Sequence, residues 1–302
     1  MHTILGAGGS VATHLTKLLI EKGANIRLVS RNPITPYPGA AWSQADLLKP
    51  DELKKAAEAS NVLYVCAGLK YDKRVWADQW PKIMKNVIDL AKYTRARLIF
   101  FDNVYMYGRV SGPMTETTPY NPTSMKGEIR ATIATMLMKE AKAGNIRASI
   151  ARSADFYAGS AKTSVFDMMV VEKFKAKQKA MWLGNPEKKH SFTYVPDAAK
   201  AMFMLGQNPD SDNEIWHVPT APALTGLEMM RMTAEACNAE FKYTRVNKFM
   251  LRTLGLFNSD VAESVEMYYQ NKYDYIFDST KFETTFKVQP TSYREGIGTA
   301  VG

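Results

Sequence analysis

The sequence is poor in the residues that cross-link a chain or bind metal ions. It contains two cysteines, Cys66 and Cys237, and four histidines among 302 residues. Two cysteines are too few for a disulfide framework, which favours a reducing compartment, and we expect the protein in the cytoplasm. Because the histidines do not cluster with cysteine or aspartate, we expect no metal site.

Long apolar runs are also absent. No run approaches the ~18 residues that a membrane-spanning helix needs, and the first predicted strand begins at the amino terminus, so we expect no membrane partner and no signal peptide. With 46% hydrophobic and 23% charged residues, the chain has ample material for a packed core.

The net charge of +9 suits either nucleic acid or a phosphorylated small ligand. Most lysines are dispersed, and the sequence has no zinc-finger spacing and no RNA-binding aromatic signature, so we expect no nucleic-acid partner. The densest basic cluster is Lys173, Lys175, Lys177 and Lys179. A solvated face is the simpler interpretation of this cluster, and contact with a ligand diphosphate is the alternative.

The first half of the chain alternates short apolar runs with amphipathic segments. Runs such as VLYVCA and RLIFF are apolar throughout, which is typical of strands buried on both faces. Strands separated by helices predict an α/β fold with a doubly wound parallel sheet. The predicted strands are residues 2–5, 26–29, 62–66, 98–101 and 146–150, and the predicted helices are residues 10–22, 51–59, 74–93 and 126–143.

After about residue 157 the loops lengthen and become richer in proline. This change predicts a second, smaller and mostly helical domain over the carboxyl ends of the strands. Its predicted helices are residues 163–177, 197–205, 224–238 and 258–269. We expect the first domain at residues 1–155, re-entered by residues 190–218, and the second domain at residues 156–189 and 219–302.

The most informative segment is MHTILGAGGSVA, where a strand, a glycine-rich turn and a helix follow one another. Its spacing is Gly6-x-x-Gly9-x-x-Ala12. Glycines let the backbone approach phosphates closely, and the helix start at Ser10 and Val11 offers N–H groups and a positive dipole end. The segment predicts a dinucleotide bound at the turn of a Rossmann domain.

The end of the second predicted strand bears on the choice of cofactor. An acidic residue there would bind the ribose 2′-hydroxyl of NAD, but residues 25–45 contain no Asp or Glu. Arg31 stands where a guanidinium would bind a 2′-phosphate. We therefore predict NADP, with NAD as the alternative and an ordinary surface arginine as the simpler interpretation of Arg31.

Seven segments in order resemble the extended short-chain dehydrogenase/reductase superfamily, in its NAD(P)-dependent epimerase/dehydratase group. Beyond the glycine turn they are Ala45-Asp46-Leu47, Cys66-Ala67-Gly68, DNVYMYG (102–108), ARSADFYAG (151–159), HSFTYVPDAAKAM (190–202) and FDSTKFETTFKVQPTSYREGI (277–297). The resemblance covers almost the whole chain and implies cofactor and substrate positions along it.

Four of these segments carry residues that the resemblance places at the ligands. Asp46 and Leu47 correspond to residues that border adenine, and Ala67 and Gly68 to residues near the nicotinamide ribose. Asp155 corresponds to a position that often faces substrate or cofactor, although a turn aspartate is the alternative. His190 precedes the segment that re-enters the first domain, and we expect it to contact a phosphate of the ligand.

The catalytic pattern of that group, Tyr-x-x-x-Lys, is incomplete in this sequence. Lys126 matches the lysine, which in the family holds the nicotinamide ribose and lowers the pKa of the tyrosine. Pro122 stands at the tyrosine position and has no proton to transfer. Asn103 stands at the serine or threonine position and can still donate a hydrogen bond to a substrate oxygen. If the strand continues, alternation places the phenols of Tyr105 and Tyr107 beside Asn103, although core packing is the alternative.

The resemblance implies an NADP-dependent oxidoreductase of the epimerase/dehydratase type. Its substrate would be a nucleotide sugar or another small molecule with a carbonyl or hydroxyl group. The rival hypothesis is an inactive NADP(H)-binding sensor or regulatory protein, because the tyrosine is missing. Residues 74–93 and 126–143 match helices that many family members use to form a homodimer, and the sequence leaves this open.

Overall fold

The computed structural model describes residues 1–158 and 164–302, and these form two compact units. Gly159, and the predicted helix start at residue 163, lie outside the described residues. Unit 1 comprises Met1–Asn103, Glu128–Arg152 and Ala198–Trp216, and unit 2 comprises Val104–Gly127, Ser153–Asp197 and His217–Gly302.

Unit 1 is built on a seven-stranded sheet with the order β12-β7-β5-β4-β1-β2-β3. The five neighbouring pairs from β7 to β3 are all parallel, and this strand order is that of a doubly wound Rossmann sheet, as predicted. The strands are β1 (His2–Leu5), β2 (Ile26–Ser30), β3 (Ala40–Gln44), β4 (Val62–Val65), β5 (Arg97–Asp102), β7 (Arg147–Arg152) and β12 (Ile215–His217).

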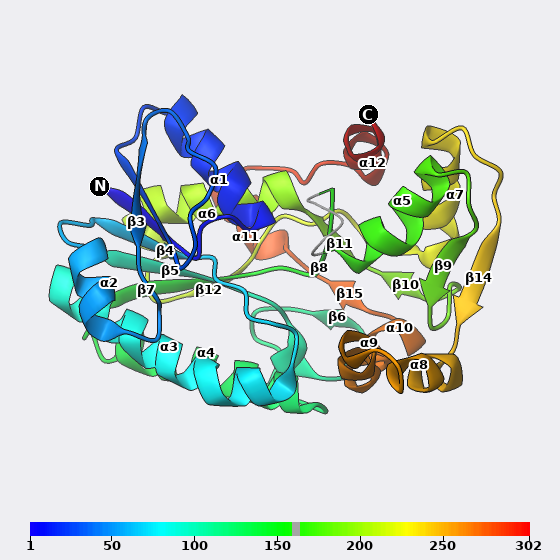
Figure 1. Ribbon diagram of the computed structural model, residues 1–302, viewed down its shortest axis with the longest axis horizontal. Coiled ribbons are helices and arrows are strands. Elements are labelled where there is room, and N and C mark those ends of the chain that lie inside the picture. The colour runs from blue at the N-terminus through cyan, green and yellow to red at the C-terminus, as the bar shows by residue number, and fades with distance from the viewer. Residues whose placement is uncertain (159–163) are drawn as a thin grey trace. The chain divides into compact units, whose positions relative to one another are not determined.

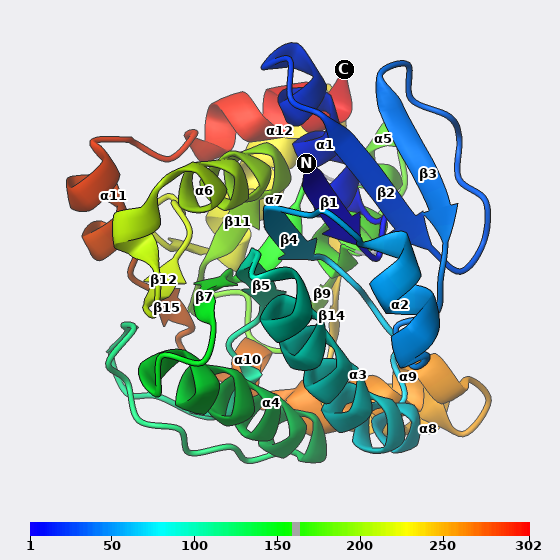
Figure 2. The same ribbon diagram turned by 90° about the vertical axis from the view of Figure 1, so that its left-hand side faces the viewer.

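Helices cover both faces of this sheet (Figures 1 and 2). On one face lie α1 (Ser10–Glu21) and α6 (Val195–Gln207), and on the other lie α2 (Pro50–Ala56), α3 (Lys73–Thr94) and α4 (Met125–Lys142). Gly23 and Gly144 follow α1 and α4 with φ of +67° and +72°, so these two helices end at left-handed glycines.

Strand β3 and the segment after β5 differ from the prediction. The β3 sequence AAWSQ lies at the sheet edge and is largely exposed, so it lacks the apolar run of the central strands. Residues 104–127, expected in the first domain, belong to unit 2. Within unit 2, β6 (Pro113–Met114) pairs with β15 (Ile276–Phe277), which lies far along the chain.

Unit 2 is about as long as unit 1, whereas we expected a smaller domain. Its described residues form four two-stranded sheets, but more of them lie in helices than in strands, which agrees with the expected mostly helical domain. Besides β6–β15, the pairs are β8 (Asp155–Tyr157) with β11 (Phe192–Tyr194), β9 (Ala180–Leu183) with β14 (Tyr243–Val246), and β10 (Lys189–His190) with β13 (Leu224–Thr225). These pairs are too short to show a clear two-residue period in the sequence.

The helices of unit 2 are mostly short. Where we predicted single helices at residues 163–177 and 258–269, the described chain has π- or 3-10-helical turns joined to α-helices. The helices are η1 (Tyr105–Tyr107), η2 (Asp167–Val171), α5 (Glu172–Lys175), α7 (Gly226–Ala236), α8 (Lys248–Gly255), α9 (Ser259–Ser264), η4 (Val265–Met267), α10 (Tyr269–Lys272), α11 (Thr280–Phe286) and α12 (Tyr293–Val301). One further short turn, η3 (Pro209–Ser211), belongs to unit 1.

Each unit has apolar side chains in its interior. In unit 1, Trp76, Trp80 and Met84 of α3 are buried, so these residues pack in the core. In unit 2, Tyr157, Trp182 and further aromatic and methionine side chains form one buried cluster. Among the described residues, no helix is both long enough and apolar enough to span a bilayer.

Candidate functional site

The glycine turn after β1 is held by backbone contacts within unit 1. Gly6 has φ of +84°, and a Cβ atom at this position would lie 2.4 Å from Cα of Ala67. Only glycine therefore fits, both for its dihedral angle and for its close approach to the chain after β4. The N–H groups of Gly6 and Ala7 both donate to the carbonyl of Val29, each at 3.0 Å.

The start of α1 is suited to an anionic group. Gly9 precedes the helix without a side-chain cap, and the first turn, which includes Ser10 and Val11, contains no acidic residue. The positive end of the helix dipole is therefore not neutralised by a carboxylate of that turn. A Cβ atom added at Gly9 would meet nothing within 4 Å, so the turn leaves open space at this point. These features fit a phosphate group.

Other predicted cofactor residues lie at the same edge of the sheet. Because β4, β1, β2 and β3 are adjacent and parallel, Ala67, Gly6, Arg31 and the Asp46–Leu47 pair all follow carboxyl ends of neighbouring strands. Arg31 is exposed, and its carbonyl accepts a hydrogen bond from the Gln44 amide at 2.9 Å.

The Asp46–Leu47 pair is fixed by hydrogen bonds. One Asp46 carboxylate oxygen accepts from the N–H of Leu48 at 2.9 Å, and the carbonyl of Leu47 accepts from the Asn86 amide at 2.8 Å. Gly68, which follows Ala67, has open space at its Cα position. The structure therefore gathers the predicted cofactor residues of unit 1 at one sheet edge.

Asn103 follows β5 and is anchored through its neighbour. Its N–H donates to the carboxylate of Asp102 at 2.9 Å, and Arg130 of α4 donates to the same oxygen at 3.1 Å. The Arg130 guanidinium lies over the ring of Trp80, 4.2 Å from its centroid. Burial raises the pKa of the Asp102 carboxyl, while Arg130 and Arg152 act in the opposite direction.

The two candidate phenols of unit 2 do not lie on a continued strand. β5 ends at Asp102, and Tyr105–Tyr107 form the 3-10 helix η1, so the expected alternation with Asn103 does not apply. Tyr107 is fully buried, and its hydroxyl forms a hydrogen bond with Nε2 of His217 at 2.8 Å. This contact supports the packing alternative for Tyr107, and Tyr105 is half-buried.

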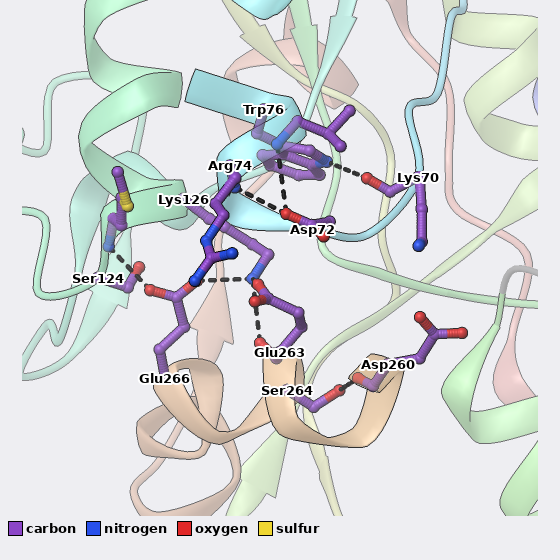
Figure 3. Close-up of polar contacts among 12 residues, drawn as sticks. Lys70, Asp72, Arg74, Trp76, Ser124, Lys126, Asp260, Glu263, Ser264 and Glu266 are labelled. Carbon is purple, nitrogen blue, oxygen red and sulfur yellow. Dashed lines mark hydrogen bonds and ion pairs between the residues drawn. The ribbon is translucent and has the colours of Figure 1, made fainter. Parts of the chain in front are cut away.

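Lys126 at the start of α4 is fully buried among acceptors from a distant segment of unit 2 (Figure 3). Its ammonium donates to the Glu263 carboxylate at 2.5 Å, the Glu263 carbonyl at 3.0 Å and the Glu266 carboxylate at 2.6 Å. The other carboxylate oxygen of Glu266 accepts from the N–H of Met125 at 2.9 Å. The lysine therefore has two acidic partners and no phenol among these contacts.

The structure brings together the two predicted substrate residues. Nε2 of His190 lies 2.9 Å from the carboxylate of Asp155. The His190 ring is buried and stacks on Tyr275, with the ring centroids 4.4 Å apart, while the Asp155 side chain is 35% exposed. The carboxylate is thus the part of the pair that a ligand can reach.

In the basic cluster, the Lys177 ammonium donates to the carbonyls of Cys237 and Asn238, so it caps the chain after α7.

Comparison with known proteins covers most of the chain. The model of the NAD dependent epimerase/dehydratase family matches residues 2–218. The chain belongs to this family. No curated protein matches the sequence.

Several solved structures of epimerases and dehydratases have a similar fold. UDP-glucose 4-epimerase of Thermus thermophilus, in complex with NAD, is 15% identical with a TM-score of 0.80, covering 100% of this chain and 98% of its own. A double mutant of the dTDP-glucose 4,6-dehydratase DesIV of Streptomyces venezuelae, with NAD and DAU bound, is 14% identical with a TM-score of 0.80, covering 100% and 95%. MoeE5, in complex with UDP-glucose and NAD, is 18% identical with a TM-score of 0.78, covering 99% and 97%.

For a member of this family, the unexpected residues are Glu263 and Glu266. The sequence analysis missed them because they lie 137 and 140 residues after Lys126. The available signal was local: Asn258 caps α9, and the two glutamates follow at a spacing of three residues, which places them on one side of a helical turn. That spacing alone does not identify their partner.

Proposed function

We propose that this protein is an NADP-dependent enzyme of the epimerase/dehydratase type that acts on a nucleotide sugar or a related small molecule. The observation that carries the proposal is the turn after β1. Gly6 lies against Ala67, Gly9 leaves open space, and α1 begins without a neutralising acid. This arrangement supports binding of a dinucleotide pyrophosphate.

The cofactor would be held mainly by backbone groups and a few side chains. Gly6, Gly9, Ser10 and Val11 would face the pyrophosphate, Asp46 and Leu47 would border adenine, and Ala67 and Gly68 would line the nicotinamide ribose. Exposed Arg31, with no acid at the end of β2, supports NADP over NAD. When bound, the nicotinamide would accept or supply a hydride.

The substrate class is proposed from chemistry and from the similar structures. UDP-glucose is bound by MoeE5, and the T. thermophilus protein is a UDP-glucose epimerase. In this chain, the amide of Asn103 would polarise the reacting oxygen. The partly exposed Asp155 carboxylate, oriented by His190, would accept hydrogen bonds from substrate hydroxyls.

A second candidate function is a dinucleotide-binding sensor without turnover. Pro122 stands where the family has its tyrosine, and the Tyr107 hydroxyl is engaged by His217. Pro122 has no proton to transfer, and the Tyr107 hydroxyl is already hydrogen-bonded, so neither residue is an obvious proton donor. A sensor would bind NADPH with the same residues and would release it unchanged.

One pair of measurements separates the two candidates. Binding of NADPH and NADH is followed by the change in their fluorescence, and both candidates predict that NADPH binds. Turnover is then measured with UDP-glucose, UDP-N-acetylglucosamine and dTDP-glucose, by product analysis and by absorbance of the reduced cofactor. An enzyme converts one of these and loses that activity in Lys126→Ala, whereas binding without conversion across a wide panel favours the sensor. Failure of both dinucleotides to bind contradicts both candidates.

We propose a homodimer through α3 and α4, although Trp76, Trp80 and Met84 belong to the core and do not supply its surface. Light scattering in solution tests it, and a monomer at micromolar concentration contradicts it. The two cysteines support a cytoplasmic protein.

A further inference from the structure

The exposed apolar side chains of unit 2 are concentrated at α8 and the turn that follows it. Among the described residues, five of the eleven exposed large apolar side chains lie between positions 249 and 257, and we call them the α8 patch: Phe249, Met250, Leu254, Leu256 and Phe257. We propose that the α8 patch binds the surface of a bilayer that contains anionic lipids. The proposal uses no residue assigned to the cofactor or the substrate, so it is independent of the proposed function.

Helix α8 is fixed to unit 2 by one side. At its start the Asn247 side chain accepts a hydrogen bond from the N–H of Met250 at 2.9 Å, and the buried Leu251 packs in an apolar cluster of the same unit. Helix α9 lies beside it (Figure 1). At about 100° per residue, the exposed Phe249, Met250 and Leu254 fall on an arc of the helix that excludes Leu251. The patch is therefore exposed on an anchored helix.

The two residues after the helix are the most exposed members of the patch. Leu256 and Phe257 are 81% and 87% exposed, and Phe249 within the helix is 77% exposed. The N–H of Phe257 donates to the Leu254 carbonyl at 3.1 Å, which closes the turn that carries them. Side chains with this exposure have few neighbours, so they project from the unit. A concentration of exposed apolar area marks an interaction surface.

The patch lies in a segment that carries positive charge alone. Residues 241–257 contain no acidic residue, and they contain four exposed basic ones, Lys242, Arg245, Lys248 and Arg252. Lys242 forms an ion pair with Glu240, whereas Lys248 and Arg252 have no acidic partner among the described residues. Lys248 and Arg252 are four residues apart, so they lie on one side of α8. The segment therefore combines exposed apolar side chains with a surface that complements negative charge.

These properties favour a bilayer over a protein partner. A groove in a partner protein recognises apolar residues at i, i+3 or i+4 and i+7 of one helix. The α8 patch does not follow this spacing, because Leu256 and Phe257 come after the last helical residue, Gly255. A bilayer has no such requirement, since it takes up exposed apolar side chains and attracts basic residues through anionic headgroups. A second copy is disfavoured too, because a twofold contact brings the basic side chains of both copies together.

Binding at the surface of a bilayer differs from crossing it. We expected no membrane partner because the sequence has no spanning run, and an interfacial helix does not need one. Such a helix lies in the plane of the surface with its apolar side chains below the headgroups. In this arrangement Phe249, Leu256 and Phe257 enter the bilayer, while Lys248 and Arg252 contact the headgroup phosphates.

Co-sedimentation of the full chain with lipid vesicles tests the proposal. Vesicles of phosphatidylcholine alone are compared with vesicles of equal parts of phosphatidylcholine and phosphatidylserine, in low and in high salt. We expect the chain to bind the mixed vesicles about tenfold more tightly than the neutral ones, because the anionic headgroups attract the basic side chains. High salt should weaken this binding.

Two double variants separate the apolar contribution from the basic one. Leu256→Gln with Phe257→Gln should weaken binding to the mixed vesicles by at least about tenfold, since two apolar side chains no longer enter the bilayer. Lys248→Gln with Arg252→Gln should weaken it about fivefold for each charge removed. All four residues are exposed, and circular dichroism verifies the fold of each variant. If the apolar variant does not fold, the charge variant carries the comparison.

Lys175→Gln with Lys179→Gln is the matched control. Both lysines are exposed in unit 2 and belong to its densest basic cluster, so the variant loses the same two charges. No exposed large apolar side chain lies in residues 172–180, so nothing there enters a bilayer. We expect this control to bind the mixed vesicles within about twofold of wild type.

The outcomes decide between the bilayer and the other possible occupants. Weaker binding by both patch variants, with the control unchanged, supports the proposal. The proposal is wrong if wild type does not bind the mixed vesicles, if both patch variants bind as wild type does, or if the control loses as much as Lys248→Gln with Arg252→Gln. Light scattering adds a further test: a wild-type dimer that Leu256→Gln with Phe257→Gln dissociates, without vesicle binding, shows that a second copy covers the patch and overturns the proposal.

Discussion

The glycine turn of unit 1 and the Lys126 cluster of unit 2 are built in different ways. The turn consists of backbone: Gly6 against Ala67, and two N–H groups on the carbonyl of Val29. The cluster consists of three charged side chains, and two of them come from a segment more than 130 residues away. The turn therefore depends on the absence of side chains, while the cluster depends on which side chains are present.

This difference has a consequence for function. A site made of backbone tolerates few substitutions, because any Cβ atom at Gly6 collides with the neighbouring chain. A side-chain cluster can be rebuilt, since acceptors for a lysine can come from any element that reaches it. In this chain Glu263 and Glu266, which come from a distant segment, contact Lys126. Breaking each region separately shows whether they differ in this way.

Gly6→Ala is expected to have the largest effect. The new Cβ atom would lie 2.4 Å from Cα of Ala67, and φ of +84° is unfavourable for alanine. We expect the free energy of unfolding to fall by roughly 3 kcal/mol, and NADPH binding to be lost. Chemical denaturation and fluorescence titration measure the two effects.

Gly9→Ala is its control, because φ at Gly9 is −76° and a Cβ atom there meets nothing within 4 Å. This variant should fold as wild type and bind NADPH more weakly, since the new methyl group points into the space proposed for the pyrophosphate. If both variants lose the same amount of stability, the collision with Ala67 is not the reason why Gly6 must be glycine.

Lys126→Met is expected to have the second largest effect. It leaves the Glu263 and Glu266 carboxylates without their shared cation, so we expect the free energy of unfolding to fall by about 2 kcal/mol. Adding Glu263→Gln should recover part of this loss, with a coupling energy of about 1 kcal/mol in a double-mutant cycle. Urea denaturation of the four proteins measures it, and additive effects would show that the pair contributes nothing.

The two regions also differ in how far the sequence predicts them. The turn could be predicted because its strand, glycines and helix are consecutive, and because β1, β2 and β4 are continuous apolar runs. By contrast, β3 was missed since its sequence AAWSQ faces solvent at the sheet edge.

The cluster could be predicted only as far as Lys126 itself. Its partners depend on how residues 258–267 fold back, and a spacing of 137 residues leaves no periodic signal. The phenols were misplaced because β5 stops at Asp102 and Tyr105–Tyr107 form the 3-10 helix η1, so the strand alternation that we assumed does not reach them.

Arg31→Ala tests the cofactor preference proposed for unit 1. Arg31 is exposed, and its only described hydrogen bond is made by its carbonyl, so we expect the free energy of unfolding to change by less than about 0.5 kcal/mol. The affinity for NADPH should fall about tenfold, through loss of a charge-assisted contact with the 2′-phosphate, and that for NADH should not change. Titration with both dinucleotides measures this, and tighter binding of NADH than NADPH by wild type rejects the proposed preference for NADP.

Tyr107→Phe has the smallest expected effect. It tests whether the Tyr107 phenol only packs in the core or also donates a proton. The variant removes a hydrogen bond to Nε2 of His217, whose Nδ1 lies 2.8 Å from the carbonyl of Asp278. Because a buried partner loses its bond, we expect the free energy of unfolding to fall by about 1 kcal/mol, with the dissociation constant of NADPH unchanged.

Thermal denaturation and titration measure these two quantities, and Tyr105→Phe, in the same 3-10 helix, is the companion variant. If Tyr107 only packs, its variant loses stability and keeps turnover. If turnover disappears while stability and NADPH binding stay the same, Tyr107 is the proton donor. In that case the 3-10 helix η1 supplies the proton donor of unit 2.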